Sequence, residues 1–169
     1  VVKCADGHAE LVGLEALARW DDPQLGLLPP FAFIETLEEY HEIHKLDQCI
    51  IDQVCRHLRE DLDAGRPAVP VSINFSRLDF ELYDVPDYLH DMTVLYDLPA
   101  NLIDVEITES ALTDQMGILQ ENMERLRKYG FSLWLDDFGS GFSSLNLLKD
   151  MHIDVVKIEF FCWLDYQLA

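Results

Sequence analysis

The sequence lacks long apolar runs and has little positive charge. No stretch reaches the roughly 18 consecutive apolar residues of a transmembrane helix, and no basic, apolar leader opens the chain, so we expect no membrane segment here. Only 12 lysines and arginines stand against 32 aspartates and glutamates, which gives a formal net charge of −20. A basic patch that binds DNA or RNA polymers is therefore not expected, although metal ions could still mediate contact with a phosphate ligand.

Cysteine is also scarce, and none of the 4 cysteines forms a CxxC pair with another. They are Cys4, Cys49, Cys55 and Cys162. Scattered cysteines of this kind are typical of reduced thiols in a cytoplasmic protein, where most of them fill the core. We therefore expect a cytoplasmic location, although the full-length protein could be anchored to a membrane elsewhere.

What the chain does have is 169 residues that are 49% apolar, which is enough for one domain with a buried core. Short β-like runs alternate with helix-like runs, and this alternation favours parallel strands with helices packed outside them. Asp6-Gly7, between two apolar runs, also predicts an antiparallel hairpin. The expected strands are 10–20, 68–76, 101–110, 131–139 and 154–159, and the expected helices are 29–40, 45–65, 85–97, 113–130 and 143–151.

Two of the expected helices carry predictions about their faces. The acidic segment 35–42 is interpreted as a solvated surface, and His41 and His44 as solvated side chains rather than metal ligands. In 45–65 the helical period places five apolar residues on the face that we expect to pack inward, namely Leu46, Ile50, Val54, Leu58 and Leu62.

Each expected strand offers a polar side chain on one face and apolar side chains on the other, because neighbouring residues of a strand point to opposite faces. The polar groups fall mostly toward the carboxyl ends of the strands, where sites form in parallel sheets and βα barrels. We therefore expect them to converge. They are Glu15, Asn74, Glu106 and Asp136, with Asp137 as a further candidate, and Lys157 lies on the polar face of the last expected strand.

The ligand types in this set indicate a particular chemistry. All are oxygen donors apart from the lysine, and hard divalent cations such as Mg²⁺ or Mn²⁺ match such donors better than zinc does. Two unneutralised carboxylates 4 Å apart would repel by roughly 4 kcal/mol at an effective dielectric of about 20. A two-metal site bridged by Asp136 would suit hydrolysis of a phosphodiester, with Lys157 positioning or deprotonating the water or stabilising charge.

The adjacent aspartates Asp136 and Asp137 are a puzzle, since a regular strand would point them to opposite faces. Asp136 can be the last inward residue of the strand, with Asp137 beginning a turn that Gly139 and Gly141 make possible. Taken singly, each polar residue has a simpler interpretation. A strand-end carboxylate is often a cap or salt-bridge partner, Asn74 could form a turn, and Lys157 could be a surface cation.

Five ordered motifs resemble the EAL-domain family of cyclic di-GMP phosphodiesterases, from Val1 to about Glu159. They are EALARW, SINFS, DVEITES, DDFGSGFSSL and VVKIE. The resemblance implies an α/β fold, a TIM-like (β/α) barrel of the EAL type with an antiparallel first strand. It also implies Mg²⁺- or Mn²⁺-dependent hydrolysis of cyclic di-GMP to linear pGpG in bacterial signal transduction.

The resemblance also assigns roles to individual residues. It implies that Lys157 and Glu15 are catalytic and that Lys157 contacts the nucleophilic water. It implies that Arg19 holds a substrate phosphate and that Leu17 lies beside the ligand. Glu109 is implied to brace the loop after Asp137. The resemblance further implies that this DFGSG loop takes part in homodimerisation and in the control of activity. It also implies that sensory or GGDEF domains can accompany the domain. The implied metal ligands are Glu15, Asn74, Glu106, Asp136 and Asp137.

The chain departs from the family mainly in length, since a complete barrel needs about 250 residues. We therefore expect residues 1–169 to be a single EAL domain truncated at both ends, with about six barrel strands and without a metal-site glutamate of the seventh. This leaves an alternative open, a catalytically inactive EAL-type module that binds cyclic di-GMP or a protein. An unrelated metal-dependent hydrolase on a βα barrel is a third interpretation.

Overall fold

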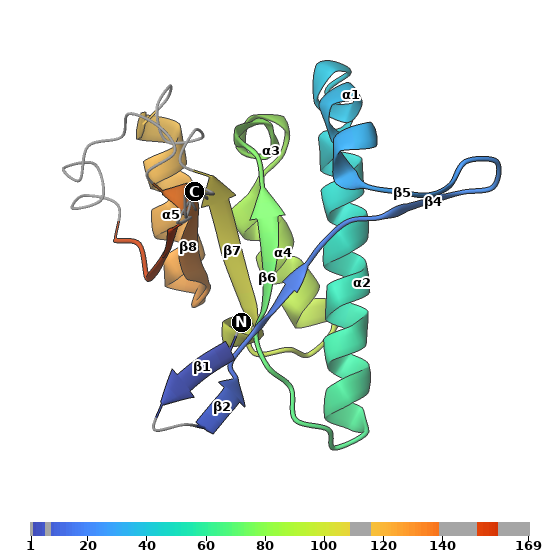
Figure 1. Cartoon of the computed structure of the whole chain (residues 1–169). Helices are drawn as coiled ribbons and strands as arrows, with labels where there is room; N and C mark the ends of the chain where they lie inside the picture. Colours follow the sequence, from blue (N-terminus) through green and yellow to red (C-terminus); the bar gives the residue numbers. More distant parts are fainter. Residues whose placement is uncertain (1, 6–7, 109–115, 139–151, 159–169) are drawn as a thin grey trace, which may run out of the picture.

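A computed structural model describes residues 2–5, 8–108, 116–138 and 152–158 of the chain. Its centre is a sheet of parallel strands in the order β3-β6-β7-β8-β9 (Figure 1). The strands of this sheet are β3 (Leu14–Ala16), β6 (Val71–Phe75), β7 (Ile103–Thr108), β8 (Ser132–Phe138) and β9 (Val155–Ile158).

Two antiparallel hairpins precede and interrupt this sheet. β1 (Val2–Ala5) pairs with β2 (His8–Leu11), which confirms the hairpin predicted at Asp6-Gly7. β4 (Trp20–Asp22) pairs with β5 (Gly26–Leu28) and projects from the body of the molecule (Figure 1). The first strand is thus antiparallel to its neighbour, whereas every strand pair within the central sheet is parallel.

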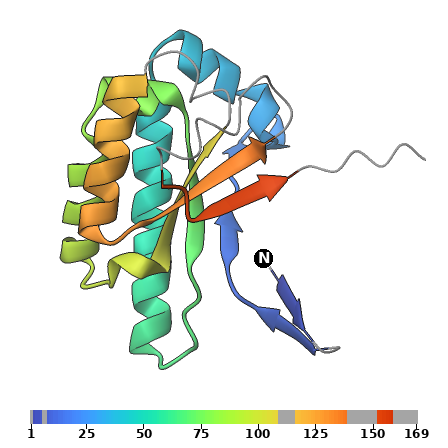
Figure 2. The ribbon, with the colours of Figure 1, turned by 90° about the vertical axis from the view of Figure 1, so that its left-hand side faces the viewer.

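The long helix 43–63 and the helices 85–95 and 116–129 lie together on one side of the curled sheet, whereas the short helices 30–32 and 34–39 lie above the ends of the strands (Figure 2). Most of the expected helices are confirmed within a few residues at their ends, but expected helix 143–151 lies outside the described residues. The helices are η1 (Pro30–Ala32), α1 (Ile34–Glu39), α2 (Ile43–Asp63), α3 (Arg77–Leu82), α4 (Val85–Leu95), η2 (Ala100–Leu102) and α5 (Met116–Tyr129).

The core lies between the sheet and these helices. Ile107, Leu133 and Leu135 point from the strands toward α5, which contributes Met123 and Leu126, and all five are at most 1% exposed. Burying such a side chain stabilises the fold by about 1.5–3 kcal/mol. The face of each strand that points away from the helices is therefore the face that can carry polar groups, as the alternation of residues predicts.

The face of α2 that packs inward differs from the prediction by about one residue. Its fully buried stripe includes Ile51 and Cys55 and, unexpectedly, Asp47, which is 5% exposed. Ile50 and Val54 only flank the core. The prediction was wrong here because a carboxylate counts as polar in a periodicity argument, although this one is buried.

The curled α/β architecture confirms the predicted fold class, an incomplete TIM-like barrel with parallel strands and outer helices. The extent of the domain, residues 1–169 as one truncated unit, stays a prediction. Among the described residues, no helix is long and apolar enough to cross a membrane.

Candidate active site

The inner face of the sheet brings Glu15 and Asn74 together. Both come from neighbouring parallel strands, β3 and β6, at their carboxyl ends. Asn74 Nδ2 donates a hydrogen bond of 3.0 Å to Glu15 Oε1. Because the amide nitrogen is used in this bond, the amide oxygen of Asn74 is left to face another donor or a cation.

Lys157 joins the two outer strands of the sheet across its inner face. Its ammonium group lies 3.3 Å from Glu15 Oε2 and forms a second, closer ion pair with Glu106 Oε1. It also lies 6.0 Å from the centre of the Trp134 ring, within the range of a cation–π contact. Three strands far apart in sequence therefore place one lysine and two carboxylates in direct contact.

Glu106 is fully buried between β6 and β8. Burial raises the pKa of this carboxyl group, and the hydrogen bond from Lys157 only partly opposes the shift. Its second oxygen, Oε2, is buried and has no hydrogen-bond partner among the described residues. A carboxylate in this situation is incompletely neutralised, so a further cation beside it would be stabilising.

The pKa of Lys157 is determined more by its carboxylate partners than by burial. Burial by itself would lower it, but the hydrogen bond to Glu106 and the surrounding carboxylate charges raise it above its ordinary value. Asp136 is one of those charges, which places it near the lysine. The lysine therefore carries its positive charge firmly at neutral pH.

A bulge in β8 resolves the puzzle of the two adjacent aspartates. Leu135 is opposite Val156 and Phe138 is opposite Ile158, so β8 advances three residues while β9 advances two. Asp137 has a φ of +56°, in the left-handed region. Leu135 and Phe138 both pack against the core, and the bulge therefore lets the two aspartates between them leave the regular alternation.

The oxygen donors of the site are of the type that binds a hard divalent cation, but they are not arranged around a metal position. Carboxylate and amide oxygens from Glu15, Asn74, Glu106 and Asp136 are the ligands that Mg²⁺ and Mn²⁺ prefer, and Glu106 Oε2 is an unused buried acceptor. As placed, however, no three His, Cys, Asp or Glu side chains within the described ranges are arranged to hold a metal ion. Instead, Lys157 supplies the positive charge between Glu15 and Glu106.

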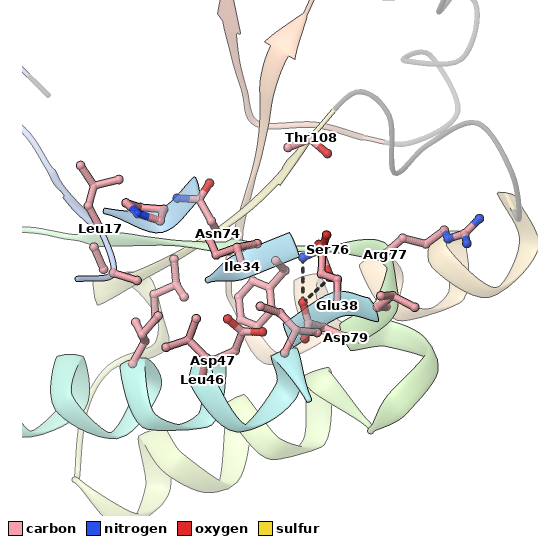
Figure 3. A pocket seen from close by; sticks show the side chains of 18 residues that line it. Leu17, Ile34, Glu38, Leu46, Asp47, Asn74, Ser76, Arg77, Asp79 and Thr108 are labelled. Carbon is pink, nitrogen blue, oxygen red and sulfur yellow. Dashed lines mark hydrogen bonds between the residues drawn. The ribbon is translucent and has the colours of Figure 1, made fainter. Parts of the chain in front are cut away.

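A cavity of about 600 Å³ opens beside this cluster (Figure 3). Leu17 and Asn74 line it at the strand ends, while Leu46 and Asp47 line it from α2. A second cavity of about 400 Å³ shares Leu17 and adds Arg19, whose guanidinium group donates to the backbone oxygen of Ala18. Leu17 thus shares a cavity with Asn74, whereas Arg19 lines the second cavity, between the end of β3 and α2.

Several residues of the larger cavity were missed by the sequence argument. Glu38, in the segment expected to be solvated, is half-buried in the cavity wall, and burial raises its pKa. Asp79 is fully buried there. Outside the cavity lining, His44 is also half-buried rather than solvated, with the centre of its ring 6.5 Å from that of Tyr83. Its place on the inward side of α2, three residues before Asp47, was the available signal. Glu109 and the loop after Phe138 lie outside the described residues.

Comparisons with known proteins identify the family to which the chain belongs. The chain is 35% identical over 150 residues to the oxygen sensor protein DosP of Escherichia coli, and 35% identical over 159 residues to the cyclic di-GMP phosphodiesterase NbdA of Pseudomonas aeruginosa. These alignments cover 89% and 94% of this chain but only 19% and 20% of the relatives, so the chain spans about a fifth of their length.

Solved structures give the same result. The phosphodiesterase PaMucR in complex with c-di-GMP superposes with a TM-score of 0.83 at 31% identity, covering 89% of this chain and 61% of that one. A c-di-GMP-bound LapD structure matches with a TM-score of 0.77 at 19% identity, covering 94% and 37%, and supports the fold alone. The model of the EAL domain matches residues 1–160, and the chain therefore belongs to the EAL-domain family.

Proposed function

We propose that the protein hydrolyses cyclic di-GMP to linear pGpG in a reaction that depends on Mg²⁺ or Mn²⁺. The observation that carries this proposal is the convergence of Glu15, Asn74 and Glu106 with Lys157 on the inner face of the sheet. Relatives named as cyclic di-GMP phosphodiesterases, and a neighbour solved with c-di-GMP, support the substrate class. The chain spans about a fifth of the length of these relatives, and the activity is therefore put forward as a proposal.

The residues that would hold the cations are Glu15, Asn74, Glu106, Asp136 and Asp137. When bound there, divalent cations would supply an activated water and hold the phosphate oxygens of the substrate. Asn74 contributes by fixing the orientation of Glu15 through its amide hydrogen bond, and the bulge at Asp137 frees the second aspartate from the strand alternation.

Lys157 has a narrower role than the sequence allowed. Since the neighbouring carboxylates keep its ammonium group protonated, it donates hydrogen bonds and stabilises negative charge rather than removing a proton from water. Arg19 and Leu17 would contact the substrate from the two cavities, with the guanidinium of Arg19 suited to a phosphate. We keep two further parts as proposals, a homodimer formed through the DFGSG loop region and companion sensory or GGDEF domains.

One observation favours the alternative, a module that binds cyclic di-GMP without cleaving it. Lys157 already neutralises Glu15 and Glu106, and the described carboxylates form no metal cage as placed. Calorimetry and a turnover assay on the same Mn²⁺-loaded sample distinguish the two functions. The hydrolase releases pGpG, and EDTA stops it. Binding heat without product would reject hydrolysis and support the binding module.

A further inference from the structure

Two buried aspartates meet where α2 packs against α3, at the floor of the larger cavity (Figure 3). Asp47 is 5% exposed and Asp79 is fully buried, and their carboxyl groups lie close enough for one to affect the pKa of the other. Ionised carboxylates are acceptors only. A hydrogen bond between two carboxyl groups therefore requires a proton on one of them.

Within the part of the chain that the structure describes, no cationic side chain takes the place of that proton. Neither Asp47 nor Asp79 forms a salt bridge with any described residue. Asp47 Oδ2 and Asp79 Oδ1 are both buried without a hydrogen-bond partner among those residues. Two buried like charges in contact would repel strongly, and proteins relieve such pairs by binding one proton between them.

The groups around the pair add negative or neutral neighbours from every side. Glu38 faces it from α1, His44 lies on α2 itself, and Tyr83 follows α3. Burial raises the pKa of Asp47 to about 9, with further contributions from the hydrogen bond to Asp79 and from the charges of Asp79 and Glu38. Tyr88 of α4 packs edge to face against the ring of Tyr83.

The pair is also tied to the strand end that carries Asn74. Asp79 Oδ2 accepts hydrogen bonds from the backbone nitrogen of Ser76 at 2.8 Å and from its Oγ at 2.9 Å. These bonds form the capping box of α3, and Ser76 follows directly after β6. One oxygen of Asp79 thus holds the turn after β6, while its carboxyl group contacts α2.

We propose that Asp47 and Asp79 share a single proton. The hydrogen bond made by this proton holds α2 against the turn that follows β6, the strand that carries Asn74 near its end. Loss of the proton leaves two facing carboxylates and pushes α3 away from α2. The device is independent of phosphodiester hydrolysis, since neither aspartate belongs to the proposed metal ligands.

The proton makes the stability depend on pH with a definite sign. The folded pKa of Asp47 is raised, so the folded protein keeps a proton that the unfolded chain releases near the ordinary value of 3.8. Between that value and about 9 the folded state binds more protons than the unfolded state. Rising pH therefore lowers the free energy of unfolding throughout this window.

Urea unfolding of the protein and of Asp47→Asn at several pH values between about 6 and 9 tests the proposal. Asparagine keeps an uncharged partner for Asp79 and has no proton to lose. We expect the midpoint of the wild type to fall with pH relative to that of Asp47→Asn, and the variant to be the more stable protein at the alkaline end. Glu60→Gln, on an exposed position of α2, should follow the wild type.

Equal pH slopes for the wild type and Asp47→Asn would overturn the proposal. A midpoint that responds to EDTA in the wild type but not in the variant would also overturn it, because a cation would then take the place of the proton. If Asp47→Asn fails to fold, infrared difference spectra of the wild type decide. A carbonyl band of a protonated carboxyl group should disappear as the pH passes about 9, and its absence at neutral pH rejects the shared proton.

Discussion

Asn74 and Glu15, 59 residues apart in sequence, are joined by a hydrogen bond from the amide nitrogen to the carboxylate. This bond fixes the orientation of Glu15 and leaves the Asn74 amide oxygen on the same side as the carboxylates. Residues that orient a metal-binding carboxylate typically affect affinity as strongly as a ligand does. The pair is therefore the natural starting point for testing the proposed cation site.

Replacing Asn74 by alanine should weaken Mn²⁺ binding by roughly 10–100-fold, because Glu15 loses its hydrogen-bond donor and the site loses an oxygen. Calorimetric titration with Mn²⁺ alone measures this without any substrate. Asn122→Ala on α5, whose amide bonds to a backbone oxygen of its own helix, is the matched control and should bind as the wild type does. Unchanged affinity in Asn74→Ala would remove Asn74 from the site.

Lys157→Met should destabilise the metal-free protein by about 3 kcal/mol, since the fully buried Glu106 loses its ion-pair partner. The same change should increase the stabilisation that Mn²⁺ gives, because the ammonium group no longer competes for Glu15 and Glu106. Urea unfolding with and without Mn²⁺ measures both effects. Lys128→Met, at an exposed position of α5, should change neither. If Mn²⁺ stabilises Lys157→Met no more than the wild type, the lysine and the cations do not share these carboxylates.

The bulge in β8 predicts opposite preferences at two adjacent positions. Because Asp137 has a left-handed backbone, Asp137→Val should be less stable than Asp137→Gly by about 1–2 kcal/mol. At Asp136, which lies in the same strand but is not among the residues with a positive φ, valine should be the more stable of the same two substitutions. All four variants lack one carboxylate, so chemical denaturation compares backbone effects alone. The same order at both positions would contradict the bulge.

Cys49 and Cys55 lie on opposite sides of α2 and should differ sharply in reactivity. Cys55 is fully buried, and burial, with the charge of Asp52, raises the pKa of its thiol to about 12, whereas Cys49 is exposed. Alkylation of the native protein near pH 8, mapped by peptide mass spectrometry, should label Cys49 and leave Cys55 unlabelled until urea is added. Equal labelling in the native state would mean that this part of α2 is not packed as described.

The sequence predicted correctly the features that depend on neighbouring residues along the chain. Alternation along strands identified Glu106 and Lys157 as inward residues, whereas the turn expected to begin at Asp137 is a bulge inside β8, which continues to Phe138. It failed at Asp47, because a buried carboxyl group is stabilised by a partner on another helix, Asp79, and no periodicity encodes such a partner. The lysine bridge between Glu15 and Glu106 was also invisible, since it depends on how strongly the sheet curls.

The most direct measurement is the conversion of cyclic di-GMP to pGpG by the folded protein with Mn²⁺, followed by chromatography beside Glu15→Gln and the exposed control Glu10→Gln. The proposed site predicts pGpG from the wild type and from Glu10→Gln, its loss on adding EDTA, and no product from Glu15→Gln, whose unfolding midpoint shows it to be folded. Product formation that survives EDTA, a Glu15→Gln variant that turns over at the wild-type rate, or no product from the metal-loaded wild type would contradict it.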